Sequence, residues 1–158
     1  MQPTISKIRP ADMAGVVSLM REFATFENLL EYCTVTEERL YTAMFGENAV
    51  VEGLIALAGQ TPVGYALFYP NFSSFRGHRG LYLEDIYINS EYRGFGLGAT
   101  IIRKIARIAA SRGFERIDFM VLDWNTPAVN FYKKLGAIRD DEERHFKFTD
   151  DAFIKLSS

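Results

Sequence analysis

The sequence has little cysteine and histidine and no long apolar run. It contains one cysteine, Cys33, and two histidines, His78 and His145, among its 158 residues. A single thiol excludes an internal disulfide framework and a Cys-rich zinc module, and the isolated histidines indicate neither a metal site nor a catalytic triad. No apolar stretch approaches the roughly 20 residues that span a bilayer, and the N-terminus has no apolar signal core. We therefore expect one soluble, cytoplasmic domain over residues 1–158, with no metal and no membrane partner.

The charges nearly balance, because 18 basic and 20 acidic residues give a net charge of −2. So small a net charge argues against nucleic acid as a partner. The balance is uneven along the chain: residues 1–60 carry four bases and eight acids, whereas residues 61–120 carry eight bases and five acids. A basic middle beside an acidic start suits an anionic cofactor beside a cationic substrate, and a solvated mixture of surface charges is the simpler alternative.

Helix-like and strand-like patterns alternate along the chain without internal repeats. Apolar residues at helical spacing predict helices at residues 11–26, 36–45, 99–112 and 126–135. Apolar runs bounded by turn residues predict strands at 4–9, 50–58, 63–69, 81–88 and 116–121, and two more between 137 and 149. The aromatic segment 70–80 is expected to be a loop. These elements predict an α/β (α+β) fold with a mixed central sheet of six to seven strands and about four helices.

The most informative motif is a glycine-rich segment between a predicted strand and an amphipathic helix. It reads Arg93-Gly94-Phe95-Gly96-Leu97-Gly98. Glycines allow positive φ and close backbone approach, and the free N–H groups of a helix start attract an anion, which favours a polyphosphate site. A turn that needs glycine only for its geometry is the alternative. A dinucleotide fingerprint fits less well, because a polar segment separates the strand from the loop and too few residues follow.

Three blocks of the chain together resemble the GNAT superfamily of N-acetyltransferases, in its diamine (spermidine/spermine) acetyltransferase branch. They are residues 81–88, residues 92–98 and residues 124–136. The resemblance implies the GNAT fold, acetyl-CoA as co-substrate, a homodimer and a small-molecule amine as partner. It implies acetyl transfer to a primary amine of a diamine, polyamine or lysine-like amino acid by direct attack on the thioester. Acetylation of a protein lysine or N-terminus, and a non-catalytic CoA-binding sensor, remain alternatives.

The resemblance also assigns roles to single residues. An alkylamine with a pKa of about 10.4 must lose a proton before it attacks, and the departing thiolate needs one. Tyr132 matches the family's general acid, and Glu84 matches the proposed general base, acting through water. Asp85, Phe26 and Glu27 match positions that bind the amine. Because neighbouring strand residues point to opposite faces, Glu84 and Asp85 share one site only if a bulge lies between Glu84 and Ile88.

The cofactor positions follow from the same resemblance. The backbone of the strand end is expected to pair with the pantetheine arm, and the glycine loop to cradle the pyrophosphate. The residues concerned are Ile86, Tyr87 and Ile88 for the arm, and Arg93, Gly94, Phe95, Gly96, Leu97, Gly98 and Ala99 for the loop. Asn125 and Ala128 are expected to touch the pantetheine, although Asn125 is equally interpreted as a helix N-cap. Arg144 stands where the polyamine enzymes tend to have tryptophan, which favours a substrate bearing a carboxylate.

Overall fold

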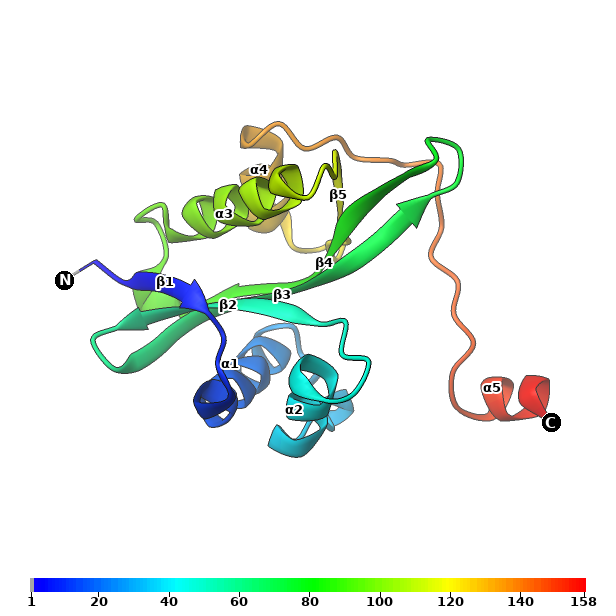
Figure 1. Cartoon of the computed structure of the whole chain (residues 1–158), viewed down its shortest axis with the longest axis horizontal. Helices are drawn as coiled ribbons and strands as arrows, with labels where there is room; N and C mark the ends of the chain where they lie inside the picture. The colour runs from blue at the N-terminus through cyan, green and yellow to red at the C-terminus, as the bar shows by residue number, and fades with distance from the viewer. Residues whose placement is uncertain (1) are drawn as a thin grey trace. The chain divides into compact units, whose positions relative to one another are not determined.

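The computed structural model describes residues 2–158, which divide into two compact units. The first extends to Met120, and the second runs from Val121 to Ser158. The first unit contains all the strands found in the described residues and three α-helices (Figure 1). None of the described helices is long and apolar enough to cross a membrane.

The first unit is built on a mixed sheet whose strands lie in sequence order. Neighbouring strands are antiparallel except the last pair, which is parallel. The strands are β1 (Thr4–Lys7), β2 (Glu52–Ala58), β3 (Thr61–Ser73), β4 (His78–Ile88) and β5 (Ile117–Asp118). The predicted fold class is confirmed, with five strands in the described residues rather than six to seven.

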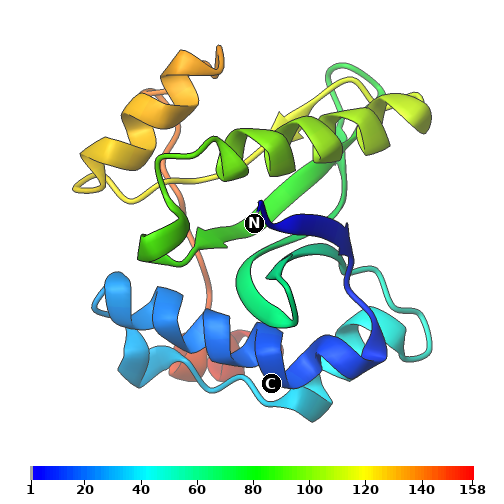
Figure 2. The same cartoon turned by 90° about the vertical axis from the view of Figure 1, so that its left-hand side faces the viewer.

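Helices cover both faces of this sheet. Helices α1 (Met13–Phe26) and α2 (Glu37–Phe45) lie on one face, and α3 (Leu97–Ser111) lies on the other (Figures 1 and 2). The buried face of α3 consists of Leu97, Ile101, Ile105 and Ala109, which recur every four residues and therefore form one stripe. Each face of the sheet has its own apolar core, so the strands between them are buried on both sides.

Residues 70–80 form a hairpin, so the predicted loop is wrong. Strand pairing continues through Phe72 with Arg79 and Ser73 with His78, and only residues 74–77 form the turn. Gly77 has a φ of +61° there, a conformation that favours glycine. Pro70 does not end the strand, because β3 continues through Ser73 despite the missing N–H. Of the two aromatic residues in this segment, Phe72 therefore lies on β3 and Phe75 in the turn.

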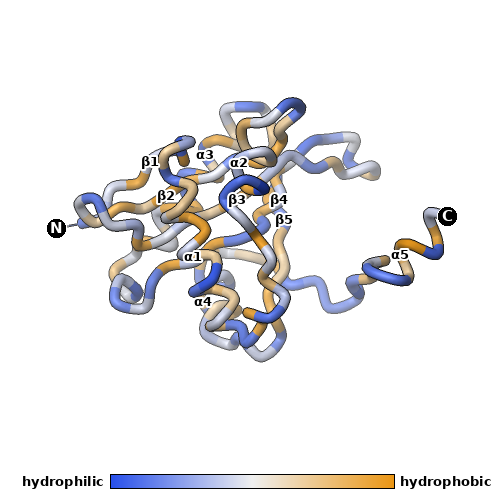
Figure 3. Tube along the Cα trace, turned by 90° about the horizontal axis from the view of Figure 1, so that it is seen from below, coloured by the Kyte–Doolittle hydropathy of each residue, from blue (hydrophilic) through white to orange (hydrophobic). Residues whose placement is uncertain are grey.

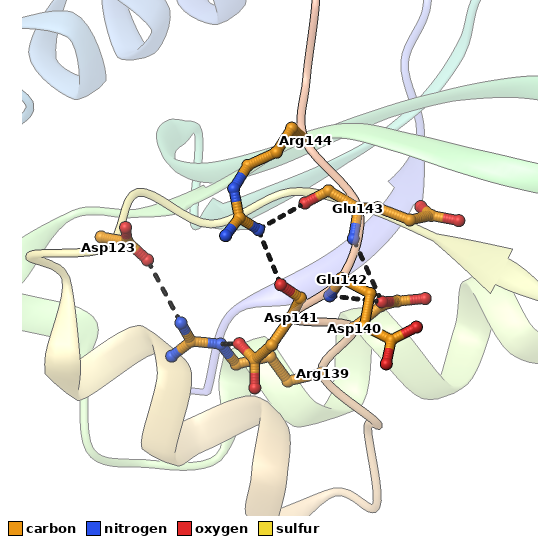
Figure 4. Close-up of polar contacts among 7 residues, drawn as sticks. All are labelled: Asp123, Arg139, Asp140, Asp141, Glu142, Glu143 and Arg144. Carbon is orange, nitrogen blue, oxygen red and sulfur yellow. Dashed lines mark hydrogen bonds and ion pairs between the residues drawn. The ribbon is translucent and has the colours of Figure 1, made fainter.

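The second unit contains α4 (Thr126–Lys134) and α5 (Asp150–Ser157), and the two strands predicted between 137 and 149 are wrong. Polar side chains supply local hydrogen bonds in that segment instead (Figure 4). Asp140 Oδ1 accepts from the backbone N–H groups of Glu142 and Glu143, and Arg144 Nη1 donates to two backbone carbonyls, those of Asp141 and Glu143. Such local bonds compete with a strand ladder.

Helix α5 was not expected from the sequence. It begins after Thr149 and has two acidic residues, Asp150 and Asp151, in its first turn. Negative charges at this end of a helix interact favourably with the helix dipole. It carries both apolar and polar positions (Figure 3), and Phe153, Ile154 and Leu156 are exposed. Strand β5 is also shorter than the predicted strand at 116–121, because only Ile117 and Asp118 pair with β4.

Candidate active site

A β-bulge lies at Glu84 in the middle of β4. Leu67 of β3 pairs with Asp85 and the next residue, Phe68, pairs with Leu83, which leaves Glu84 as the extra residue. The bulge therefore falls on the first residue of the predicted range.

The bulge reverses which side chains of β4 face α3. Before it, Leu81 and Leu83 belong to the core on the α3 side; after it, Ile86 and Ile88 pack there. Tyr87 belongs to the core on the opposite side, beneath α1 and α2. Glu84 and Asp85 consequently point to the same face of the sheet, although they are adjacent in sequence.

Two tyrosines of β3 hold these two carboxylates. The hydroxyl of Tyr65 donates to Asp85 Oδ2 at 2.9 Å, and the hydroxyl of Tyr69 donates to Glu84 Oε2 at 2.9 Å. Tyr65 and Tyr69 are four residues apart on one strand and so share a face. Sequence reasoning missed both tyrosines; the signal was two phenols at even spacing in an otherwise apolar strand.

Burial and mutual repulsion alter the acidity of this cluster. Burial raises the pKa of Asp85 to about 6; the Tyr65 hydrogen bond opposes this rise and the nearby Glu84 charge adds to it. Burial also raises the pKa of Glu27, with a further contribution from Asp85. The pKa values of Tyr65 and Tyr69 are raised, by burial first and by their carboxylate partners next, so both phenols remain donors at neutral pH. The three carboxylates form a site that favours a cation.

The end of α1 brings Glu27 to this cluster. The helix ends in a Schellman motif, in which Asn28 adopts a φ of +57°. Asn28 N–H donates to the carbonyl of Thr25 at 3.1 Å, and Leu29 N–H donates to that of Ala24 at 2.8 Å. This turn fixes the direction of Glu27, which is half-buried, while the preceding Phe26 is 41% exposed.

The glycine loop has the backbone geometry of an anion cradle. Gly94 and Gly96 have φ values of +84° and +79°, and a Cβ added to either would meet no protein atom within 4 Å. The first helical hydrogen bond of α3 runs from Thr100 N to Gly96 O at 3.0 Å. The N–H groups of Leu97, Gly98 and Ala99 precede this bond, so they have no acceptor within the helix. The Phe95 side chain is exposed, whereas that of Leu97 belongs to the core. These residues fit a diphosphate at the start of α3.

The end of β4 has an edge that suits an extended ligand. Strand β5 pairs only with Leu81 and Tyr82 of β4. In the described part of the sheet, residues 83–88 therefore have a strand partner on one edge alone. A backbone edge of this kind can accept a peptide-like arm as an added strand, which fits the predicted pantetheine position at Ile86, Tyr87 and Ile88.

The second unit holds the remaining predicted residues. Asn125 Oδ1 accepts from Ala128 N–H at 3.3 Å and so caps α4, which confirms the N-cap interpretation of Asn125. Tyr132 lies in the second half of α4, with its ring 5.1 Å from that of Phe131 in an edge-on arrangement. No cluster of three or more metal-ligating side chains occurs among residues 2–158.

The bulged strand therefore brings two carboxylates to one face, where they suit a cation, and the glycine loop at the start of α3 suits an anion. Residues 17–137 match the acetyltransferase (GNAT) family, and the chain belongs to that family. It is an N-acetyltransferase.

Relatives and solved structures agree with this placement. The chain is 37% identical to the thialysine N-epsilon-acetyltransferase of Bos taurus, over 97% of this chain and 96% of that protein. It is 30% identical to the spermidine/spermine N(1)-acetyltransferase-like protein 1 of Homo sapiens, over 92% of this chain and 22% of that protein. An integron cassette protein from the mobile metagenome of V. cholerae has the same fold, with a TM-score of 0.83, 22% identity, and coverage of 99% of this chain and 98% of that one.

Proposed function

We propose that this enzyme transfers the acetyl group of acetyl-CoA to the terminal amine of a lysine-like amino acid or small diamine. The observation that carries the proposal is the bulge at Glu84. It places two carboxylates on one face, each held by a tyrosine hydroxyl.

The chemistry assigns different tasks to the two carboxylates. Asp85 is half-buried and fixed by Tyr65, which suits it to hold and orient the ammonium form of the acceptor. Glu84 is exposed, which suits it to take the acceptor's proton through a water molecule. Glu27 adds negative charge at the end of α1 and further favours a cation.

Acetyl-CoA, when bound, supplies the acetyl group on a thioester. Gly94 and Gly96 would hold its diphosphate, with Arg93, Phe95, Leu97, Gly98 and Ala99 completing the loop and helix start. Ile86, Tyr87 and Ile88 would align its arm through their backbone, and Asn125 and Ala128 would flank it. In this reaction the amine nitrogen would bond to the acetyl carbon as the carbon–sulfur bond breaks. Glu84 would receive the amine proton, and the Tyr132 phenol would donate a proton to the sulfur.

The preference for a lysine-like acceptor is supported by similarity and by charge. The relative from Bos taurus is named for thialysine, a lysine analogue with sulfur in place of a methylene. Arg144 supplies a guanidinium suited to an acceptor carboxylate. The polyamine spermine, which has no carboxylate, is expected to be the poorer substrate.

The test is CoA release over a panel of thialysine, lysine, ornithine, putrescine, spermine and a lysine-containing peptide. We expect thialysine and lysine to lead, and Tyr132→Phe to lower kcat about 100-fold. The matched control is Tyr41→Phe on α2, an exposed tyrosine whose loss should leave turnover unchanged. Acetyl-CoA binding without turnover of any amine would favour the sensor alternative, and preference for the peptide would favour a protein acetyltransferase.

We also propose that the enzyme is a cytoplasmic homodimer. The dimer contact that we propose lies near the tip of the β3–β4 hairpin, where the Phe72 side chain is 65% exposed and that of Phe75 is fully exposed. Burying such rings on association removes apolar surface from water. Light scattering of the wild type and Phe75→Ser checks this: a dimer that persists unchanged in the variant places the contact elsewhere.

A further inference from the structure

The side chain of Arg93 does not extend alone into solvent from the start of the glycine loop. Its Nε donates to the backbone carbonyl of Ile88 at 2.7 Å. Its guanidinium carbon lies 4.8 Å from the ring centre of Phe26 and 5.3 Å from that of Tyr87. Both rings are within the range of a cation–π contact, so the guanidinium lies against aromatic side chains of α1 and β4.

Further contacts extend this arrangement into α1. The Tyr87 ring also stacks on Phe23, with 5.4 Å between the centroids and 27° between the planes. Asn89, just beyond β4, donates through Nδ2 to Glu22 Oε2 at 3.1 Å. The last two turns of α1 are therefore connected to the end of β4 and to the first residue of the glycine loop through Arg93.

We propose that Arg93 is a positioning residue that fixes the amine-binding end of α1 to the glycine loop, and that its side chain is not a phosphate ligand. This inference rests on the proposed function, because it takes Phe26 and Glu27 as parts of the amine site. The geometry supports it: the guanidinium is directed to Ile88 and to two rings, whereas the cradle at Gly94 and Gly96 is made by backbone groups.

The two roles predict opposite kinetic effects. Without the guanidinium, Phe26 in the last turn of α1 loses its cation–π contact with Arg93, which is itself held on β4 by Tyr87 and the Ile88 carbonyl, so Glu27 should sample more directions. We expect Arg93→Ala to raise the KM for the amine about tenfold and to change the Kd for CoA less than about twofold. Arg93→Lys keeps the charge but not the planar fork, and we expect it to raise the amine KM about threefold.

A second measurement needs neither substrate nor turnover. Amide hydrogen exchange of the free protein reports the opening of the α1 end, where Glu27 N–H bonds to Phe23 O at 3.0 Å and Leu29 N–H to Ala24 O at 2.8 Å. We expect Arg93→Ala to speed exchange at residues 27–29 about tenfold, with little change in the core of α3.

Arg79→Ala is the matched control, because the Arg79 guanidinium carbon also lies over a ring, that of Phe114, at 5.2 Å and away from the proposed site. It should leave the amine KM, the CoA Kd and exchange at residues 27–29 unchanged. A tenfold weaker CoA Kd in Arg93→Ala, with unchanged amine KM and exchange, would make Arg93 a phosphate ligand and overturn the inference. If the wild type acetylates no amine, the proposed function fails, and the exchange measurement still decides whether Arg93 fixes α1.

Discussion

The hydroxyl of Tyr65, a residue with no exposed surface, donates a 2.9 Å hydrogen bond to Oδ2 of Asp85 on the neighbouring strand. This bond favours the ionised form of a carboxyl group that burial otherwise pushes toward protonation. The charge of Asp85, and with it the attraction for an amine, therefore depends on a residue that the substrate need not touch.

Replacing Tyr65 by phenylalanine should raise the pKa of Asp85 above its value of about 6, because the hydrogen bond that stabilises the carboxylate is lost. Fewer molecules then carry the charge at pH 6 to 7. We expect the acid limb of kcat/KM for the amine to move to higher pH. Rates measured from pH 5 to 9 check this, with Tyr41→Phe as the control. If the acid limb of the pH profile does not move, the charge of Asp85 does not determine amine binding.

Replacing Asp85 by asparagine should stabilise the ligand-free protein at neutral pH. The folded state binds this proton more tightly than the unfolded state, so the stability contributed by Asp85 is full below pH 3.8 and is lost as the pH rises through about 6. The difference between the ordinary pKa of 3.8 and the folded-state pKa of about 6 corresponds to at most about 3 kcal/mol of stability at pH 7.5. Urea unfolding at pH 7.5 and pH 4 should show a gain for Asp85→Asn only at the higher pH.

Asp118 provides the opposite case for the same measurement. Burial disfavours its charge, but hydrogen bonds from Arg116 at 2.8 and 2.7 Å and from Asn71 at 3.1 Å lower its pKa overall. Asp118→Asn should therefore destabilise the protein at pH 7.5. Two asparagine variants that shift stability in the same direction would contradict these assignments.

Replacing Glu84 by glutamine should lower kcat about 100-fold if Glu84 accepts the amine proton. Because the deprotonated amine is abundant only at high pH, we expect the activity of Glu84→Gln to recover as the pH approaches 10. The check is kcat for thialysine between pH 6 and 10. If Glu84→Gln retains wild-type kcat while Asp85→Asn loses it, then Asp85, whose pKa is about 6, is the base instead.

Replacing Gly96 by alanine should weaken CoA binding about tenfold, because the new Cβ occupies the open side of the cradle. It should also cost about 1 kcal/mol of folding stability, since φ is +79° there. Gly113, at the other end of α3, has a φ of +73° and equally open surroundings. Gly113→Ala should show the same loss of stability with unchanged CoA affinity in calorimetry.

The sequence was most informative where local patterns agree with local structure. The helix at residues 36–45 begins after Thr36, whose hydroxyl accepts from Arg39 N–H at 3.2 Å, and ends before Gly46. The apolar stripe of α3 was equally visible, because its spacing follows the helical period. The structure of residues 137–149 was not visible in the sequence, because alternating residues there resemble a strand. Side-chain hydrogen bonds, such as those that Asp140 accepts, satisfy the backbone locally instead.

By itself, the sequence indicated the fold class and the glycine loop through residue type and spacing, and its resemblance to the GNAT family indicated the pair Glu84 and Asp85. The tertiary structure decided how those residues are directed. The bulge at Glu84 is visible only in the pairing of β4 with β3, and it turns adjacent carboxylates to one face. Tyr65 and Arg93 act across 20 and 67 residues, respectively, on Asp85 and Phe26. Contacts over such separations leave no periodic signal in the chain, since they arise only when distant elements pack together.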